Sequence, residues 1–294
     1  MLAAVTPRPH GAQSMTAPLR EALVKRPGAA FARAFEDPAH GFLRPVDLER
    51  ARREHDALRA LLERLGVTVH ELGDGEGGPD LVYTFDPALV TRRGAVLLRS
   101  GKATRRGEEE ILGRWLAGHG IPVVARIEAP GTVDGGDTFW LRPDLFCIGR
   151  SLRTNRAGAE QLASIVRDLV GGEARIFDVP YANGPGECLH LLSLISPVAD
   201  DLAVAHLPQL PAGLHELLGE LGVRLVPVPA EEMPTLGCNV LAVRPRVLIM
   251  ASGNPRTEAA LGAEGCEVHP FPAGEVGVNG GGGPTCLTRP LLRE

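Results

Sequence analysis

Hydrophobic positions recur along the chain in one repeated phrase: an amphipathic helix, a Gly near its end, and a short run of β-branched residues. A Gly at that place supplies the left-handed residue that lets a helix end and the chain turn into a strand. The runs that follow have the composition and alternation of strands. The five copies are LLERLGVTVHEL (61–72), WLAGHGIPVVARI (115–127), IVRDLVGGEARIFDV (165–179), LLGELGVRLVPV (217–228) and ALGAEGCEVHPF (260–271).

A second phrase alternates with the first. It is an apolar strand, then a polar or Gly-containing loop, then the next helix, and it covers residues 94–116, 144–166, 202–221 and 246–265. The segment ALVKRP (22–27) opens in the same way, and a helix is predicted around 46–65. Together the two phrases predict a strand–helix–strand–strand unit, repeated about five times over roughly 50 to 55 residues each.

Five such units must bury their sheets against each other, and a ring does this without long free edges. The sequence therefore predicts an α/β fold, a five-bladed α/β propeller with pseudo-fivefold symmetry built from repeated ββαβ units. The alternative is a doubly wound α/β sheet, which has fewer strands per helix. We expect one catalytic domain over residues 19–294, preceded by a flexible N-terminal extension over residues 1–18; the second Met, at position 15, leaves open whether residues 1–14 are translated.

Composition narrows the classes of function. The chain has 294 residues, 44% of them hydrophobic, with a formal net charge of −5, and it has no long basic run. We therefore expect no nucleic-acid partner. No apolar stretch approaches the roughly 20 residues that span a bilayer, and the first residues lack the apolar block of a signal peptide. These features predict a cytoplasmic protein with no membrane partner; the oligomeric state stays open, a homodimer included.

The cysteines form neither a disulfide framework nor a CxxC metal pattern, because their number is odd and their spacing wide. Four of them are interpreted as small buried hydrophobic residues: Cys147, Cys188, Cys238 and Cys266. Cys286 differs because it follows a run of glycines, which lets the backbone approach a ligand closely.

Polar residues stand at matching places in the repeat, in the loop after each helix–Gly–strand phrase. In a ring these loops would converge on a central cavity. The residues are Asp80 and Asp86, Asp134 and Asp137, His190, Asn239, and Cys286. A Cys, a His and a carboxylate facing one cavity are the parts of a thiol nucleophile with its acid–base partner. Several carboxylates there would favour a cationic substrate.

Each of these residues also has a structural interpretation. A single His is more often structural than catalytic, an Asp-Gly-Gly-Asp segment is usually a turn, and the glycines at 280–283 could form a flexible loop. Their equivalent positions in the repeat favour a shared site, since unrelated turn residues would not be expected to coincide in this way.

Several segments together resemble one family. They are DLVYTFD (80–86), SGKATRR (100–106), VDGGD (133–137), GRSLRTN (149–155), LHLLS (189–193) and TC (285–286). The sequence from about Leu23 to Leu292 is similar to the dimethylarginine dimethylaminohydrolases. They belong to the superfamily of guanidino-group modifying enzymes, with arginine deiminases, agmatine deiminases and amidinotransferases.

The resemblance implies a role for each matching residue. Asp86 would grip the substrate guanidinium, Asp134 would be the acidic partner in catalysis, His190 the acid–base group and Cys286 the nucleophile. Arg105 and Arg153 would bind the substrate carboxylate, although Arg105 could be a surface residue and Arg106 could point inward instead. Asp80 would receive the α-amino group or cap a turn. Asp137 is interpreted as structural, holding the Gly-Gly turn.

The resemblance thus implies a cysteine-dependent hydrolase that cleaves Nω-methylated arginine to citrulline and an alkylamine. This chemistry requires no cofactor and no metal. Two departures favour a deiminase or other hydrolase acting on arginine or a related guanidine: Phe85 stands where an acidic residue is usual, and the glycine-rich loop is closer to that of arginine deiminases. The alternative from another class is a non-catalytic propeller that binds a protein partner.

Overall fold

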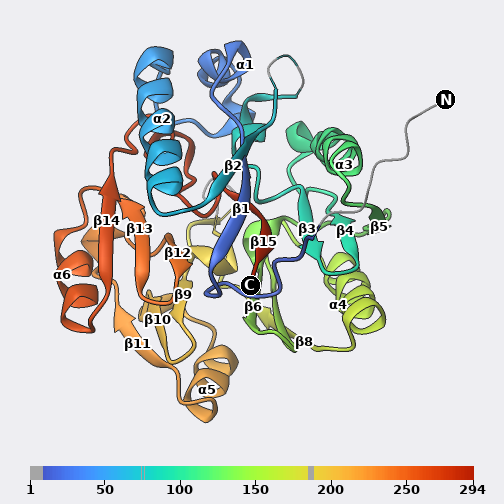
Figure 1. The fold of residues 1–294 in the computed structure, drawn as a ribbon, viewed down its shortest axis with the longest axis vertical. Helices are drawn as coiled ribbons and strands as arrows, with labels where there is room; N and C mark the ends of the chain where they lie inside the picture. Colours follow the sequence, from blue (N-terminus) through green and yellow to red (C-terminus); the bar gives the residue numbers. More distant parts are fainter. Residues whose placement is uncertain (1–8, 74, 76, 185–188) are drawn as a thin grey trace.

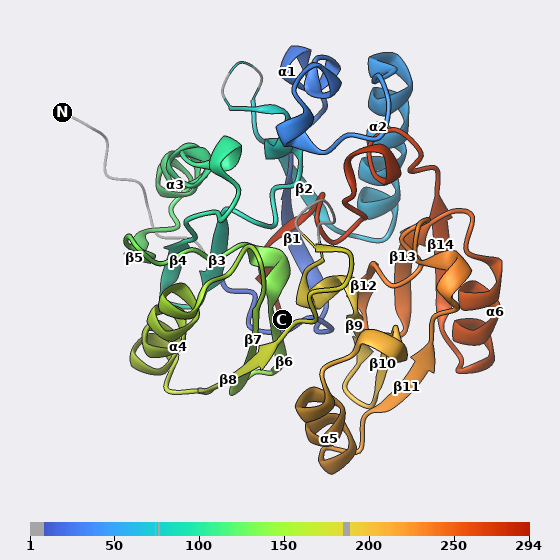
Figure 2. The same cartoon turned by 180° about the vertical axis from the view of Figure 1, so that it is seen from behind.

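The computed structural model describes residues 9–73, 75, 77–184 and 189–294, and in them the strands form five separate three-stranded sheets. The α/β class expected from the sequence is confirmed. The doubly wound alternative is wrong for the described residues, because every sheet there has three strands. In Figures 1 and 2 the colours of the sequence run once around the molecule, with α2 to α6 at its periphery and the sheets inside.

Each sheet belongs to one ββαβ unit. The strands and helices of the five units are β15 (Arg289–Arg293), β1 (Leu19–Val24), α2 (Leu48–Arg64) and β2 (Thr68–Glu71); β3 (Ala88–Thr91), β4 (Gly94–Leu97), α3 (Glu108–Gly118) and β5 (Val123–Arg126); β6 (Thr138–Arg142), β7 (Leu145–Arg150), α4 (Arg156–Val170) and β8 (Glu173–Asp178); β9 (Ile195–Ala199), β10 (Leu202–Ala205), α5 (Ala212–Glu220) and β11 (Arg224–Pro227); β12 (Val240–Arg244), β13 (Val247–Ala251), α6 (Pro255–Ala263) and β14 (Glu267–Phe271). A short helix α1 (Ala29–Ala32) precedes α2.

The middle strand of every sheet pairs antiparallel with the first strand and parallel with the third. The helix crosses between the two parallel strands, as a parallel connection requires. In the first unit the antiparallel partner comes from the other end of the chain, because β15 pairs with β1. The last strand therefore completes the first sheet and joins the two ends of the chain.

The five helix–Gly–strand phrases are confirmed. Each helix is followed by a glycine with positive φ before the third strand of its unit: Gly66 (90°), Gly120 (81°), Gly171 (71°), Gly222 (71°) and Gly265 (77°). An L side chain is strained in that conformation. Glycine at these places thus ends the helix and sets the direction of the outer strand.

Hydrophobic side chains gather in five clusters, and each cluster joins neighbouring units. One links the first and second units through Leu81 and Leu112, and another links the second and third through Val96 and Phe146. The remaining three join the third to the fourth, the fourth to the fifth and the fifth to the first. Each sheet thus buries its faces against both neighbours, and burial of apolar area there is the main stabilising term.

The N-terminal segment differs from the expected flexible extension over residues 1–18. Of that stretch, residues 9–18 lie against the sheets. The Gly11 amide donates to the Leu291 carbonyl at 2.8 Å, and the Ala12 amide donates to the Val90 carbonyl at 3.0 Å. These backbone bonds continue the edge of β15 and hold the segment, a pairing that the sequence pattern did not indicate.

The cysteines outside the candidate site follow the structural interpretation in part. Cys147 and Cys238 are buried, Cys266 is half-buried, and Cys188 lies outside the described residues. Within the described part of the chain, none of the helices has the length and apolar character that crossing a bilayer requires.

Candidate active site

The candidate carboxylates, His190, Asn239 and Cys286 come from the loops that join the third strand of one unit to the first strand of the next, whereas Arg105 and Arg153 lie in loops between the middle strand and the helix of a unit. A short 3₁₀ turn lies in each of the five loops between units, at Pro79–Val82, Gly135–Asp137, Leu191–Ser193, Ala230–Glu232 and Val278–Gly280. The equivalent placement that the repeat predicts is therefore present, and hydrogen bonds between the loops bring their side chains together.

Asp86 is a buried carboxylate fixed from two sides. Its Oδ1 accepts from the Gly136 amide at 2.7 Å, and its Oδ2 is paired with Arg105 Nη1. Burial alone would raise the pKa of Asp86, but Arg105, His190 and the Gly136 amide together hold it below its ordinary value. Asp86 therefore carries a negative charge at neutral pH, inside the protein.

Arg105 is buried and held by several acceptors. Its Nε donates to Glu108 at 2.8 Å, and its Nη2 donates to the carbonyls of Asp80 and Tyr83, each at 3.2 Å. Burial raises the pKa of Glu108 to about 7, although Arg105 opposes the shift. Arg106 is exposed, and Arg105 is the arginine of the two that points inward, as the family resemblance implied. Its bonds orient Asp86, however, and leave it little capacity for a substrate carboxylate.

Asp134 is the second buried carboxylate, and one of its oxygens is open. Oδ1 accepts from the Gly101 amide at 3.0 Å. Oδ2 has no hydrogen-bond partner among the described residues, and Arg153 Nη1 lies 3.9 Å from it. Burial and the nearby Asp86 raise the pKa of Asp134, against the opposing effects of His190, Arg105 and the Ser100 hydroxyl. A buried carboxylate with an open oxygen suits a cationic ligand.

Asp137 has a different role from Asp134, three residues before it. Its oxygens accept from Ser151 Oγ at 2.6 Å, Thr154 Oγ1 at 2.7 Å and the Leu191 amide at 3.0 Å. The same carboxylate lies 3.2 Å from Nδ1 of His190. Asp137 therefore ties its turn to the loop at 151–154 and to Leu191, and its carboxylate also lies beside the imidazole ring of His190, a contact that the sequence did not indicate.

The thiol of Cys286 lies beside an amide side chain from another unit. Asn239 Nδ2 donates to Cys286 Sγ at 3.2 Å, and Asn239 Oδ1 accepts from the Thr285 amide at 3.1 Å. Burial raises the pKa of the Cys286 thiol to about 11, and Asp86 adds to this effect, whereas Asn239 and His190 oppose it. The thiol is thus protonated at neutral pH in the free protein.

The glycine-rich segments are explained by close packing. A Cβ at Gly283 would lie 2.6 Å from Asn239, and one at Gly282 would lie 2.5 Å from the Tyr83 ring. In the other Gly-rich loop, a Cβ at Gly136 would lie 2.9 Å from the imidazole ring of His190. Real Cβ atoms do not approach so closely, so only glycine lets these loops reach the site.

Asp80 is occupied. Lys102 Nζ donates to Asp80 Oδ1 at 2.8 Å and to Oδ2 at 2.9 Å, and His40 Nδ1 lies 2.7 Å from Oδ2. The α-amino site that the family resemblance implied at Asp80 thus already holds an ammonium group from the chain itself.

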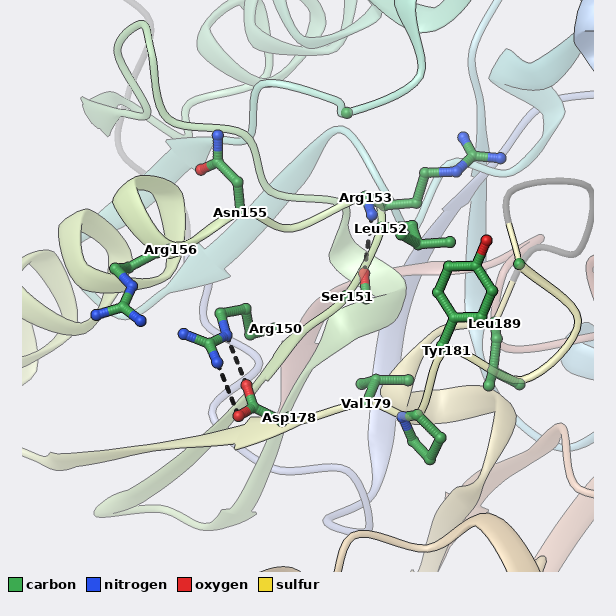
Figure 3. A pocket seen from close by; sticks show the side chains of 13 residues that line it. Arg150, Ser151, Leu152, Arg153, Asn155, Arg156, Asp178, Val179, Tyr181 and Leu189 are labelled. Atoms are coloured by element: carbon green, nitrogen blue, oxygen red, sulfur yellow. Dashed lines mark hydrogen bonds and ion pairs between the residues drawn. The ribbon is translucent and has the colours of Figure 1, made fainter.

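Arg153 lines a pocket of about 480 Å³ that opens beside these residues, together with Gly101, Leu152 and Tyr181. The same pocket holds Arg150, which is paired with Asp178 at 2.6 Å. Figure 3 shows the Arg153 side chain extending to the side opposite this pair. Arg153, with a side chain 20% exposed, and the exposed Arg156 are therefore the arginines that line the pocket besides this pair, and Arg153 is the one next to Asp134.

Phe85, the departure from the usual acidic residue, belongs to a hydrophobic cluster with Phe139 and Leu191. The guanidinium of Arg289 lies over its ring, 4.0 Å from the centroid, and donates to the Phe85 carbonyl at 2.8 Å. Burial lowers the pKa of Arg289 to about 9. Position 85 is therefore a packing position here, adjacent to Asp86.

The structure brings Asp86, Asp134, His190 and Cys286 together, with Arg105 behind Asp86 and Arg153 at the edge. Sequence reasoning placed Asn239 at a matching position but gave it no role, and it missed Lys102, His40 and Glu108. Lys102 stands inside a recognised motif, yet no pattern signalled its partner. No group of three or more His, Cys, Asp or Glu side chains in the described ranges is arranged to hold a metal ion.

Comparisons with known proteins identify the family of the chain. The family model for arginine deiminase matches residues 77–207 and 190–293. The dimethylarginine dimethylaminohydrolase of Pseudomonas aeruginosa is 33% identical over 225 residues, covering 76% of this chain and 81% of the relative. That of Streptomyces coelicolor is 30% identical, covering 85% and 89%. A solved structure of the Pseudomonas aeruginosa enzyme, a Cys-to-Ser mutant with citrulline, matches 94% of this chain and 100% of that chain with a TM-score of 0.78 at 25% identity.

Proposed function

The chain belongs to the arginine deiminase family, within the guanidino-group modifying superfamily that includes the dimethylarginine dimethylaminohydrolases, and from this premise we propose that it hydrolyses a C–N bond in the guanidino group of an arginine-like small molecule. Cys286 is the nucleophile. The guanidinium group of the substrate is a cation, which suits a site with two buried carboxylates.

A guanidinium carbon is a poor electrophile because its charge is delocalised. Asp86 and Asp134 hold the guanidinium nitrogens and fix the carbon next to Cys286 Sγ. Arrival of the cation offsets the burial that keeps the Cys286 thiol protonated, so the thiol gives its proton to the neutral imidazole of His190 and becomes the thiolate. The thiolate attacks the carbon and gives a tetrahedral adduct on sulfur.

His190 moves the protons. As an imidazolium oriented by Asp137, it gives its proton to the leaving amine, whose C–N bond breaks and leaves an S-alkylthiouronium on Cys286. The neutral imidazole then takes a proton from water, which attacks the same carbon. Collapse of the second adduct breaks the C–S bond, releases a ureido product and restores the thiolate.

The observation that carries this proposal is that the half-buried Cys286 lies together with the buried His190, Asp86 and open oxygen of Asp134. The leading substrate class carries a methylated guanidine, as the names of the two relatives suggest. The second candidate reaction is deimination of an unmethylated guanidine. Phe85 favours deimination, because it stands next to Asp86 at a position where dimethylarginine dimethylaminohydrolases usually have an acidic residue.

We infer further that the five ββαβ units are the blades of a propeller with pseudo-fivefold symmetry, forming one catalytic domain. The five clusters between neighbouring units and the closure of the first sheet by β15 support this architecture. It accounts for the convergence of five loops on one site.

The test is an assay of wild-type protein on arginine, mono- and dimethylarginine, agmatine and related guanidines. It measures both the ureido product and the amine released. Methylamine or dimethylamine release supports the leading candidate, and faster ammonia release from the unmethylated compounds supports the second. Absence of ureido product from every guanidine would refute the proposed function.

A further inference from the structure

The ammonium group of Lys102 is bonded to acceptors in all three of its N–H directions. It donates to both oxygens of Asp80, at 2.8 and 2.9 Å, and to the backbone carbonyl of His40 at 2.8 Å. The side chain is only 12% exposed, and that of Asp80 is 5% exposed. A lysine has three donors, so Lys102 is fully coordinated.

Asp80 has in turn no need of a further cation. Besides Lys102, its Oδ2 is 2.7 Å from Nδ1 of His40. A substrate ammonium directed to this carboxylate would meet a buried positive charge within a few ångströms, and like charges in a poorly solvated place repel strongly.

This cluster lies on the rim of the candidate site. Gly101, the residue before Lys102, donates its amide to Asp134 and lines the pocket beside Arg153. The Asp80 carbonyl accepts from Arg105, the partner of Asp86. Asp134 is thus hydrogen-bonded to the residue before Lys102, and Asp86 is linked to the backbone of Asp80 through Arg105.

The charge that the pocket presents to the end of a substrate opposite its guanidine is therefore positive. Arg153 lines the pocket with its guanidinium partly exposed, whereas Asp178, a carboxylate in the same pocket, is paired with Arg150. In this pocket Arg153 can pair with a carboxylate of a ligand. The carboxylate of Asp80 cannot pair with an ammonium group of the ligand, because it is already bonded to Lys102.

We propose that Lys102 fills the α-ammonium site, and that the substrate is an ω-guanidino carboxylic acid without an α-amino group. The inference rests on the proposed function and specifies its substrate class. Lys102 is a specificity-determining residue: it excludes amino acids by occupying Asp80, and Arg153 receives the carboxylate.

The experiment compares pairs of compounds that differ only in the α-amino group, with the guanidine kept constant. L-arginine is paired with 5-guanidinopentanoate, and Nω,Nω-dimethylarginine with its deamino counterpart. Wild-type protein is expected to show a kcat/KM at least about tenfold higher for the deamino member of whichever pair it hydrolyses, the size typical of a site that cannot pair a buried charge.

The variant Lys102→Ala empties the subsite and frees the oxygens of Asp80. It should raise kcat/KM for the amino acid by about tenfold or more, and change that for the guanidino acid by less than about threefold. Arg106→Ala is the matched control, because Arg106 is an exposed cation in the same loop. It should leave both values unchanged.

A readout independent of turnover is calorimetric binding of the two products, citrulline and 5-ureidopentanoate, which needs no variant. Tighter binding of 5-ureidopentanoate supports the inference. A wild-type preference for the amino acid, in turnover or binding, would overturn it while leaving the proposed function intact. If no guanidine were hydrolysed by wild-type protein or by Lys102→Ala, the proposed function itself would fail.

Discussion

At the Cys286 end of the site, Asp134 keeps one carboxylate oxygen without a hydrogen-bond partner among the described residues, whereas at the Lys102 end both oxygens of Asp80 are taken. Both carboxylates are buried. The first end has retained a buried carboxylate oxygen with no hydrogen bond in the described part of the chain, 3.9 Å from Arg153 Nη1, and the second has bonded both oxygens within the chain. An unmet buried charge is costly unless a ligand completes it, so the difference indicates where the cation of a substrate binds and where it does not.

The largest effect is expected at the nucleophile. Cys286→Ser should lower kcat by on the order of 10⁴-fold, because the hydroxyl of serine is a far weaker nucleophile than a thiolate. Steady-state assay of ureido product checks this. Cys266→Ser is the control, since Cys266 is a half-buried cysteine outside the site, and it should keep wild-type activity. Substantial turnover by Cys286→Ser would remove the covalent step.

Asp134→Asn should separate activity from stability. We expect kcat/KM to fall by about 10²–10³-fold, since a charge-assisted contact to the guanidinium is lost. Burial raises the pKa of Asp134, so its ionisation costs stability as the pH rises through that pKa. The variant should therefore melt at the same temperature as wild type or higher at pH 8, and the difference should shrink towards pH 4. A clear loss of stability at pH 8 would contradict the open-oxygen interpretation.

The reactivity of Cys286 should depend strongly on pH. With its pKa raised to about 11 by burial, the thiolate fraction and the rate of alkylation by iodoacetamide should rise about tenfold per pH unit from pH 7 to about 10. An unreactive guanidine bound in the site should increase the rate at pH 7, because its charge stabilises the thiolate. A rate that levels off near pH 8.5 without ligand would show that burial does not control this thiol.

Asp80→Asn should lower stability and leave activity nearly unchanged, the reverse of the effects expected for Asp134→Asn. It leaves Lys102 buried with a neutral partner, which should cost about 1–3 kcal/mol of folding free energy. The kcat for a guanidino acid should change by less than about threefold in the folded variant. Chemical denaturation and the product assay measure the two effects. A large loss of turnover without loss of stability would place Asp80 in substrate binding.

The sequence predicted the framework well because its signals are local and repeated. Five helix–Gly–strand phrases gave the five sheets, since a positive φ after a helix strongly favours glycine. The family motifs gave Asp86, Asp134, His190 and Cys286, and the repeat gave their common location. Pairing of residues 9–18 with β15 and β3 was missed, because backbone hydrogen bonds between distant segments leave little trace in side-chain patterns.

The contacts of the site were predictable only in part. Lys102 donates to Asp80, and Arg105 contacts Glu108 and Asp86. These partners depend on the distances between loops in the folded chain. Phe85 was correctly singled out, but its partner Arg289 lies 204 residues away. Spacing along a sequence carries no information about such contacts.

The most direct test of the central claim, that Cys286 attacks a guanidine carbon, is intact-mass and peptide mass spectrometry of His190→Gly mixed with the S-methylisothiourea analogue of a guanidine that wild-type protein hydrolyses. The variant lacks the acid that protonates a leaving amine and the base that activates water; methanethiolate leaves without that acid, so an S-alkylthiouronium should accumulate. The expected result is an adduct of the analogue less methanethiol, on the peptide that contains Cys286. Turnover by wild-type protein with no such adduct in the variant, or with the adduct on another cysteine, would contradict the claim.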